Sequence, residues 1–173
     1  MRLLLCLFGL SLFTLAPVNA DDKPAKPNAL TSKEVADGWI LLFDSETTFG
    51  WKIDGDASVK DGRLVIGGEK PSRGTITSMY RDWELYLDSE GEGQLTLTTG
   101  DGSKISAGLG TQKLKLWATG GGVTGAHIEV RSGPVNQATF SYDGSKPVQV
   151  TVEVAAGKYV AIADVKLKPL GLK

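Results

Sequence analysis

Hydrophobic and polar residues alternate along much of the chain with a period of two. In the segment 148–154, valine occupies every second position and polar residues fill the positions between. The same alternation recurs in the segments 83–88, 94–98 and 113–117. Because successive side chains of an extended strand point to opposite sides, each segment predicts a strand with one buried face and one polar face. Such strands are typical of antiparallel sheets that face the core on one side.

Asp-Gly pairs separate several of these strand candidates. They stand at positions 54–55, 61–62, 101–102 and 143–144. This dipeptide favours the tight turns that join antiparallel strands, because glycine readily adopts the left-handed backbone conformation that such turns require. The strand candidates follow one another at roughly the 8–12-residue spacing of sandwiches and barrels. We predict eleven or twelve short strands, which are enough for two packed sheets.

Two local features interrupt the strand pattern. Thr31 and Glu34 have the spacing of a helix capping box, and Gly38 follows soon after, so we expect a helix of only one or two turns. Near the C-terminus the alternation changes phase, which predicts a bulge near Ala163. The expected fold is therefore an all-β, antiparallel β-sandwich with one short N-terminal helix.

The first 20 residues have the layout of a secretory signal peptide. Arg2 precedes an apolar run over 3–16, and small residues stand before the expected cleavage point after Ala20. The run is shorter than the roughly 20 residues that cross a bilayer, so we expect cleavage and no membrane span in the remainder. Residues 21–30 contain two prolines and four charges and predict a flexible leader. We therefore expect an exported protein, periplasmic or extracellular, with a single domain over 31–173.

Composition narrows the candidate chemistry. The 173 residues include 19 basic and 20 acidic ones, so nothing indicates a general phosphate-binding surface, and we expect no nucleic-acid partner. Cys6 is the only cysteine and lies in the expected signal peptide, which excludes disulfides, thiol catalysis and cysteine metal sites from the mature protein. The 22 glycines agree with many turns and short strands.

The only histidine lies in a strand candidate beside two charged residues. His127, Glu129 and Arg131 share one face of that strand, at about 6.5–7 Å per two residues. A row of imidazole, carboxylate and guanidinium groups favours binding of sugar hydroxyls, or a base beside a carboxylate that orients it. His127 and Glu129 would also supply two ligands to a divalent metal, which needs further oxygen ligands. The alternative is a solvated strand face with a cross-strand ion pair.

The tryptophans divide between the core and candidate ligand contacts. Trp83 shares the phase of the leucines around it, and Trp39 and Trp51 flank the first apolar strand, so we place these three side chains in the core. Trp117 shares its phase with lysines and precedes a glycine-rich stretch, which makes it the best candidate for stacking on a sugar ring, with Tyr86 second. Packing under a loop is the alternative for both.

Several short motifs at the two ends of the chain form a recognisable series. The first motifs are Gly38-Trp39, Leu42-Phe43-Asp44, Gly50-Trp51-Lys52 and Val59-Lys60-Asp61-Gly62-Arg63-Leu64. The segment 73–87 continues the series with Tyr80-x-Asp82-Trp83-Glu84-Leu85, and the segment 163–170 closes it. Over roughly 30–88 and 158–170, the chain resembles the 3-keto-disaccharide hydrolase domain family as a short and divergent member. The Asn-Ser-Gly strand that usually follows in that family is missing here.

This resemblance implies a concanavalin A-like lectin/glucanase fold, a curved jelly-roll sandwich whose concave face binds carbohydrate. It also implies exported action on glycosides already oxidised to a ketone at carbon 3. In such a substrate the ketone acidifies the proton at carbon 2, a base removes that proton, and the glycosidic oxygen then leaves. A metal or a hydrogen-bond donor would hold the enolate, so a divalent metal ion is the one cofactor that the resemblance leaves open.

Two carbohydrate-related functions follow from these observations, and a structural or scaffold domain of the envelope is a third alternative, supported only by the lack of a clear site. The first is an exported hydrolase or lyase on 3-keto-glycosides, with His127 as base or metal ligand, Glu129 as partner carboxylate and Arg131 as a clamp for an anion or hydroxyl. Glu84 and Asp88, on a neighbouring strand candidate, are acidic alternatives. The second is a non-catalytic carbohydrate-binding module of the same fold, which the missing Asn-Ser-Gly strand favours. In either case the expected partner is a carbohydrate.

Overall fold

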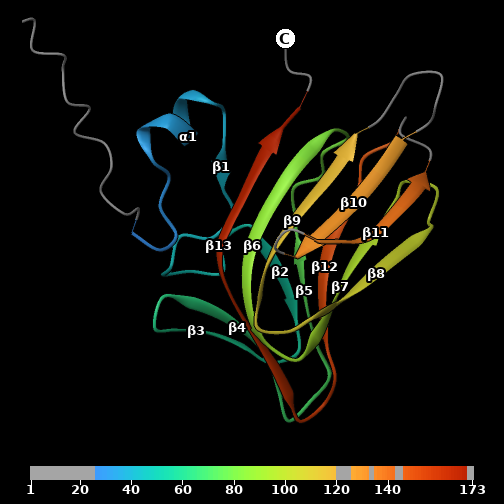
Figure 1. Cartoon of the computed structure of the whole chain (residues 1–173). Coiled ribbons are helices and arrows are strands. Elements are labelled where there is room, and N and C mark those ends of the chain that lie inside the picture. Colours follow the sequence, from blue (N-terminus) through green and yellow to red (C-terminus); the bar gives the residue numbers. More distant parts are fainter. Residues whose placement is uncertain (1–25, 120–125, 133–134, 143–145, 171–173) are drawn as a thin grey trace, which may run out of the picture.

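The computed structural model describes residues 26–119, 126–132, 135–142 and 146–170. The expected signal peptide and the first half of the expected leader lie outside these ranges. Within them, two antiparallel sheets pack face to face, and one helix lies at one end of the sandwich (Figure 1). The predicted all-β sandwich with one short helix is therefore confirmed. No helix in the described part of the chain has the length and hydrophobicity of a membrane span.

The strands divide between an eight-stranded and a five-stranded sheet. The larger contains β1 (Ile40–Leu41), β3 (Ala57–Lys60), β4 (Arg63–Gly68), β6 (Trp83–Gly91), β9 (Gln112–Thr119), β10 (Ala126–Ser132), β11 (Val135–Tyr142) and β13 (Lys158–Pro169). The smaller contains β2 (Trp51–Asp54), β5 (Ser72–Ile76), β7 (Gly93–Thr98), β8 (Lys104–Leu109) and β12 (Gln149–Val154). Their orders are β11-β10-β9-β6-β13-β4-β3, with β1 also paired to β13, and β2-β5-β12-β7-β8.

The described residues form thirteen strands, slightly more than the eleven or twelve expected. The difference is explained by very short elements such as β1, which has only two residues. A strand of that length shows no alternation of its own. It is defined by its hydrogen bonds to β13, which no local pattern predicts.

Alternation places a continuous hydrophobic layer between the sheets. Leu85 of β6 and Leu116 of β9 are fully buried, and they share one core cluster with Leu97 of β7 and Val152 of β12, which are each 1% exposed. Fully burying one such side chain stabilises the fold by about 1.5–3 kcal/mol. Because the hydrophobic positions of each strand face this layer, its polar positions face outward. Each sheet therefore has an outer polar face, and these two faces are the candidate functional surfaces.

Two of the three tryptophans predicted to lie in the core do so, and the third does not. Trp51 and Trp83 belong to the core, with 7% and 1% of their surfaces exposed. The prediction for Trp39 is wrong, because this residue is half-buried and lies outside the core cluster. Its backbone N–H donates to the carbonyl of Glu34, which ties it to the end of the helix rather than to a strand between the sheets.

The predicted bulge interrupts the pairing of β13 with β6. The register shifts between Ala163 and Lys166, and Asp164 adopts a left-handed conformation with φ of 49°. The inserted residues let hydrophobic side chains from both phases of β13 enter the core. Those side chains are Val160, Ile162, Val165 and Leu167. The expectation of a bulge near Ala163 is therefore confirmed.

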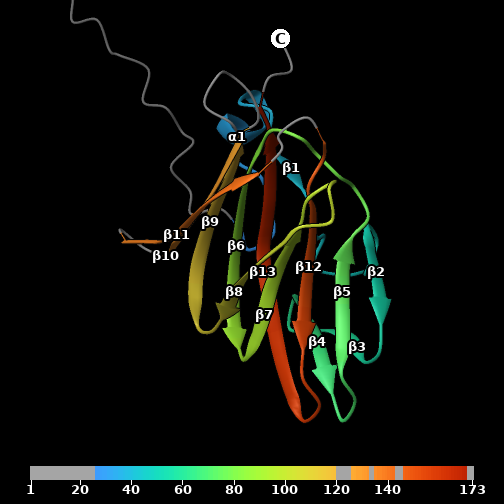
Figure 2. The same ribbon diagram turned by 90° about the vertical axis from the view of Figure 1, so that its right-hand side faces the viewer.

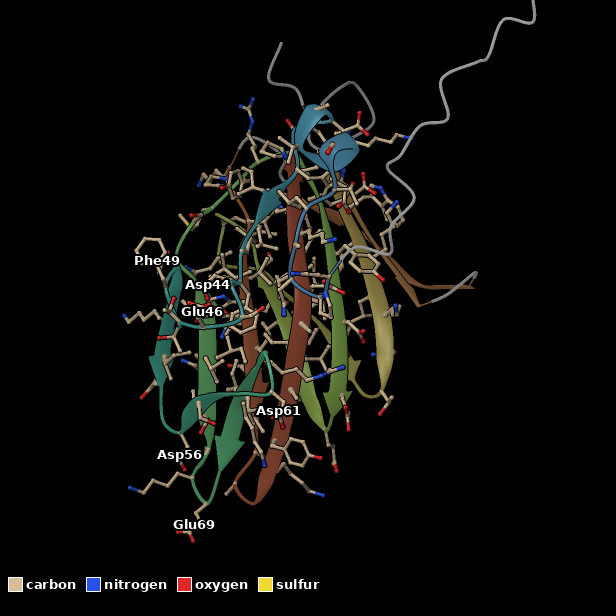
Figure 3. The ribbon with its side chains drawn as sticks, turned by 90° about the vertical axis from the view of Figure 1, so that its left-hand side faces the viewer. Asp44, Glu46, Phe49, Asp56, Asp61 and Glu69 are labelled. Carbon is tan, nitrogen blue, oxygen red and sulfur yellow. The ribbon has the colours of Figure 1, made fainter. Side chains whose placement is uncertain are left out.

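The helix α1 (Ser32–Ala36) has the predicted capping box. The Thr31 hydroxyl accepts from the Glu34 backbone N–H at 3.1 Å, and the Glu34 carboxylate accepts from the Thr31 N–H at 2.7 Å. The same carboxylate pairs with the ammonium of Lys166 on β13 at 3.1 Å. Figure 3 shows α1 at one end of β13, where this ion pair fastens the helix to the eight-stranded sheet.

Candidate functional site

The outer face of the five-stranded sheet carries three cross-strand rows of polar side chains. Figure 2 presents this sheet to the viewer. The rows arise because every second residue of each strand points away from the core and antiparallel pairing brings those residues side by side. The hydroxyl row is Lys52-Thr75-Thr151-Thr96-Ser106, the charged row is Asp54-Arg73-Glu153-Gln94, and the donor row is Gln149-Thr98-Lys104.

The hydroxyl row forms the floor of this face. The hydroxyls of Thr75 and Thr151 lie 3.2 Å apart, and those of Thr96 and Ser106 lie 3.1 Å apart. In the Thr75–Thr151 pair either oxygen can be the donor, whereas Ser106 donates to Thr96, because the Thr96 proton is given to Glu153. Thr96 and Thr151 are only 3% and 7% exposed although they point away from the core, because larger neighbours cover them. The threonine hydroxyls therefore support one another and stiffen the sheet under the more exposed groups.

The charged row is built around the carboxylate of Glu153. Arg73 contacts one oxygen of that carboxylate through Nη2 at 2.8 Å and through Nε at 3.1 Å. The hydroxyl of Thr96 donates to the other oxygen at 2.9 Å. Because both oxygens already accept hydrogen bonds, Glu153 is placed to orient the arginine rather than to act as a free base.

The donor row contrasts with the two rows beside it. Gln149, Thr98 and Lys104 make no side-chain hydrogen bond or ion pair with any residue that the structure describes. Gln149 and Thr98 are half-exposed, and Lys104 is exposed. A primary amide, a hydroxyl and an ammonium group therefore stand side by side on β12, β7 and β8, and none of the described residues uses their hydrogen-bonding capacity.

Two adjoining hollows lie over these rows, and we refer to them together as the groove. The larger, about 520 Å³, is lined by the charged row together with Glu92 and Lys158. The smaller, about 250 Å³, lies over the donor row and the three threonines of the hydroxyl row. Both are lined by Arg73 and Glu153, so they adjoin each other at this ion pair. The larger hollow is within the size range of small-molecule sites, which is roughly 300–1,000 Å³.

The chemistry of the groove is that of hydrogen bonding. Its described lining contains no aromatic side chain and no His or Cys. Of its three carboxylates, Glu153 is held by Arg73 and Glu92 pairs with Lys158 at 2.7 Å. No group of three metal-ligating side chains occurs among the described residues. The groove thus suits a ligand rich in hydroxyl groups, held by polar contacts rather than by stacking.

Sequence reasoning missed this groove. The available signal was the polar phase of the segments 94–98 and 149–153, which contains threonine, glutamine and glutamate. Taken strand by strand, such residues indicate only a solvated face. The groove exists because β7 and β12 pair with each other although about fifty residues separate them in the chain.

The residues predicted as a site belong to strands of the other, eight-stranded sheet. Glu84, Tyr86 and Asp88 alternate along β6 with its buried residues, so they belong to the outer face of the eight-stranded sheet. Trp117 of β9 is in register with Glu84. The structure therefore brings four of the predicted residues together, and it places them away from the groove.

Lys115 connects two of these predicted residues. Its ammonium group forms an ion pair with the Glu84 carboxylate and lies 4.6 Å from the centre of the Trp117 ring. The ammonium thus occupies one face of the indole in a cation–π contact. Trp117 itself is half-buried. Glu84 is consequently paired, and the ring has less free surface for stacking than an isolated exposed tryptophan.

The strand β10 carries the remaining predicted residues. In the backbone register, His127 is opposite Thr119, Glu129 is opposite Trp117, and Arg131 is opposite Lys115. The predicted row therefore lies on the strand next to β9, two strands from β6. The side chains of this strand lie outside the described part of the chain, so their roles stay predictions.

A loop between β1 and β2 presents a third feature. Figure 3 labels Asp44, Glu46 and Phe49 close together on this loop, and Phe49 is 88% exposed. The hydroxyl and backbone N–H of Thr47 bind the Asp44 carboxylate and lower the pKa of Asp44 to about 2. This carboxylate also accepts from the backbone N–H of Glu46 at 2.9 Å. It therefore organises the loop, and it is poorly suited to accept a proton from a substrate.

Comparisons with known proteins bear on the fold. No protein-family model matches the chain, and no curated protein matches its sequence. The structure is similar to that of a Parabacteroides distasonis protein provisionally described as a glycosyl hydrolase, with a TM-score of 0.59 and 14% identity, over 84% of this chain and 100% of that one. It is also similar to the Crh5 transglycosylase without ligand, with a TM-score of 0.55 and 9% identity, over 87% of this chain and 90% of that one.

At these identities the likeness concerns the fold alone. The Crh5 transglycosylase in complex with NAG gives a TM-score of 0.50 at 10% identity, over 73% of this chain and 82% of that one. The chain therefore has a two-sheet β-sandwich fold that a protein described as a glycosyl hydrolase and a transglycosylase also have.

Proposed function

We propose that this protein binds carbohydrate in the groove on the outer face of its five-stranded sheet. The observation that carries the proposal is that two adjoining hollows lie over three rows of hydrogen-bonding side chains. Sugar hydroxyls both donate and accept hydrogen bonds, as do the hydroxyl and amide groups of these rows. The sequence motifs and the carbohydrate-active proteins of similar fold support the same class of ligand.

Unused hydrogen-bonding capacity decides where in the groove a sugar would be held. Gln149 and Gln94 have no side-chain hydrogen bond to another described residue, whereas the floor threonines bond to one another. A ligand therefore gains new hydrogen bonds from the amides without breaking those of the floor. An amide hydrogen bond contributes about 0.5–1.5 kcal/mol net, so a few such contacts give the modest affinity expected of a polar groove.

Backbone amide NMR of the purified protein provides the test. Titration with cellotetraose, chitotetraose and tetragalacturonate should shift the amide resonances of β7, β8 and β12. Gln149→Ala should weaken binding of the ligand that produces the shifts by about three- to tenfold, because it removes one or two hydrogen bonds. Ser58→Ala serves as the control, since Ser58 is exposed on β3 of the other sheet.

Two results would contradict this proposal. One is a set of shifts confined to β6 and β9, which would move the binding surface to the other sheet. The other is unchanged affinity in Gln149→Ala when the variant keeps the folded spectrum, because that amide lies within the smaller hollow.

A second candidate function is cleavage of 3-keto-glycosides on the eight-stranded sheet. The resemblance to the 3-keto-disaccharide hydrolase family supports it, together with the backbone register that sets β10 beside β9. In this proposal His127 is the base or a metal ligand, Glu129 its partner carboxylate and Arg131 the clamp. Asp88 is a better acidic alternative than Glu84, because Lys115 already pairs with Glu84.

Release of the aglycone from a 3-keto-glucoside tests the second candidate. The assay is run with and without chelator, so that a divalent metal requirement is measured at the same time. His127→Ala should abolish turnover. No turnover by the folded protein under either condition would leave carbohydrate binding without this chemistry, and turnover retained in His127→Ala would remove that residue from the mechanism.

We also infer that the protein is exported after cleavage behind Ala20. The short apolar run after Arg2 and the small residues before the cleavage point support this inference. N-terminal sequencing of the protein recovered from the periplasm or the medium should begin at Asp21. An intact N-terminus in protein from the cytoplasmic fraction would contradict it.

A further inference from the structure

The donor row has an unusual composition for a surface that faces a groove. Its three side chains present an ammonium, a hydroxyl and a primary amide, and none of them is an acid. Neighbouring strands lie about 4.8 Å apart, so the row spans about 10 Å across β12, β7 and β8. Lys104 can only donate hydrogen bonds, and the other two residues can donate as well. Each residue of the row can therefore present a donor to a ligand, and the row contains no carboxylate.

Among the residues that the structure describes, the charges along the rest of the groove leave this end positive. Arg73 neutralises Glu153, and Lys158 neutralises Glu92. The carboxylate of Asp54 remains at the other end, four strands from β8 and two rows from the donor row. Strand spacing and rise place it about 23 Å from Lys104, well beyond the screening length of roughly 8–10 Å at moderate salt.

The acid nearest to Lys104 in the chain is Asp101, in the loop that joins β7 to β8. Its carboxylate accepts hydrogen bonds from the Thr99 hydroxyl and from the Ser103 backbone N–H. These contacts fix the loop, and no ion pair links Asp101 to Lys104 in the part of the chain that the structure describes. The ammonium of Lys104 thus stays available to a ligand.

We propose that the groove binds an acidic oligosaccharide, whose carboxylate or sulfate group lies against the donor row. This inference rests on the proposed carbohydrate-binding function and adds the class of sugar. An anionic oxygen would accept a charge-assisted hydrogen bond from Lys104 and neutral ones from Thr98 and Gln149, and the charge-assisted bond is the strongest of these. The hydroxyl and charged rows would hold the neutral sugar units that follow.

Matched pairs of ligands isolate the effect of the ligand's negative charge on affinity. Calorimetry compares a panel of uronate oligosaccharides with their methyl esters, which keep the sugar and its stereochemistry but lose the negative charge. Sulfated oligosaccharides with their desulfated counterparts form a second arm and distinguish sulfate from carboxylate. The acid should bind about fivefold more tightly than its ester, and the advantage should shrink at high salt.

Two variants assign the charge effect to the donor row. Lys104→Gln should weaken binding of the acid by about fivefold, toward the affinity of its ester, and should weaken binding of the ester far less. Lys60→Gln makes the same charge change on an exposed residue of β3 and should alter neither ligand. Both variants are at exposed positions, and a melting curve checks that they remain folded.

The outcomes separate this inference from the function on which it rests. Equal affinity for acid and ester, or an unchanged preference in Lys104→Gln, would overturn the acidic ligand while leaving a carbohydrate groove. Absence of binding by every acidic and neutral sugar would instead overturn the proposed function, and the inference with it.

Discussion

The segment before α1 offers a direct test of how the sandwich is closed. Asn28 is 6% exposed and lies in the left-handed region with φ of 54°. Its amide nitrogen donates to the Gly62 carbonyl at 2.7 Å, and its amide oxygen accepts from the Asp164 backbone N–H at 2.6 Å. Asn28 thereby connects the N-terminal segment to the β3–β4 turn and to the bulge of β13. Removing this side chain should destabilise the whole sandwich.

The expected size of the effect follows from two terms. Asn28→Ala removes both side-chain hydrogen bonds, which contribute about 1 kcal/mol each. It also leaves alanine in the left-handed region, where its Cβ is crowded by the backbone, which adds about 1 kcal/mol. We therefore expect the free energy of unfolding to fall by about 3 kcal/mol. For Asn28→Gly the free energy of unfolding should fall by only about 2 kcal/mol, because glycine tolerates the backbone conformation.

Urea unfolding followed by tryptophan fluorescence measures these differences by linear extrapolation. Lys26→Ala is the control, because Lys26 is exposed and such surface changes stay within about 0.5 kcal/mol. A loss below about 1 kcal/mol in Asn28→Ala with an unchanged m-value would refute the reasoning. The segment would then be detached in solution, as the expected flexible leader over 21–30 implies.

Three further predictions concern single side chains. Glu34→Gln should lower the free energy of unfolding by about 1–3 kcal/mol, because it leaves the buried Lys166 ammonium without its ion pair while glutamine can still cap the helix. Burial raises the pKa of Glu34, but the hydrogen bonds of its capping box and of Lys166 outweigh burial and hold that pKa below 4.5. The difference in the free energy of unfolding between wild type and Glu34→Gln should thus have its full size above pH 4.5 and shrink as the pH falls through the lowered pKa of Glu34 in the folded state. A difference that grows on acidification would contradict the ion pair. The carboxyl ¹³C titration of Asp44 should give a pKa of about 2 that returns toward 3.8 in Thr47→Val, and a wild-type value near 3.8 would argue against the loop geometry. Gly67→Ala should lower the free energy of unfolding in urea by about 1–3 kcal/mol, because φ is 111° there and a Cβ would collide with a backbone carbonyl of β13. An unchanged free energy of unfolding would mean that β4 and β13 lie further apart at this position.

Local patterns predicted the elements because their causes are local. The valines of 148–154 indicated β12, the phase change near Ala163 indicated the bulge, and the spacing of Thr31 and Glu34 indicated the capped helix. Each depends on residues within one turn or one strand. Trp39 was misplaced for the complementary reason, since its burial depends on how the end of α1 lies against the sandwich.

For the predicted site residues, the sequence indicated the strand face but not the contacts between strands. Alternation correctly put Glu84, Tyr86 and Asp88 on one polar face of their strand, and it put Trp117 on the polar face of another. It did not predict that Lys115 pairs with Glu84 and lies over the Trp117 ring, because the pairing with Glu84 depends on the register of β6 against β9. A shift of one residue would have turned every side chain of a strand to the other face.

The sequence by itself determined which residues of each strand are buried, where the strands turn and that the chain forms an all-β sandwich. These properties follow from the period of two of an extended backbone and from the burial of hydrophobic side chains. Only the tertiary structure decided that Arg73, Thr98, Lys104 and Gln149 line one groove, while the predicted site residues belong to the opposite sheet. The physical reason is that strand order and register are set by hydrogen bonds between segments far apart in the chain, and a local pattern contains no information about which strands will pair.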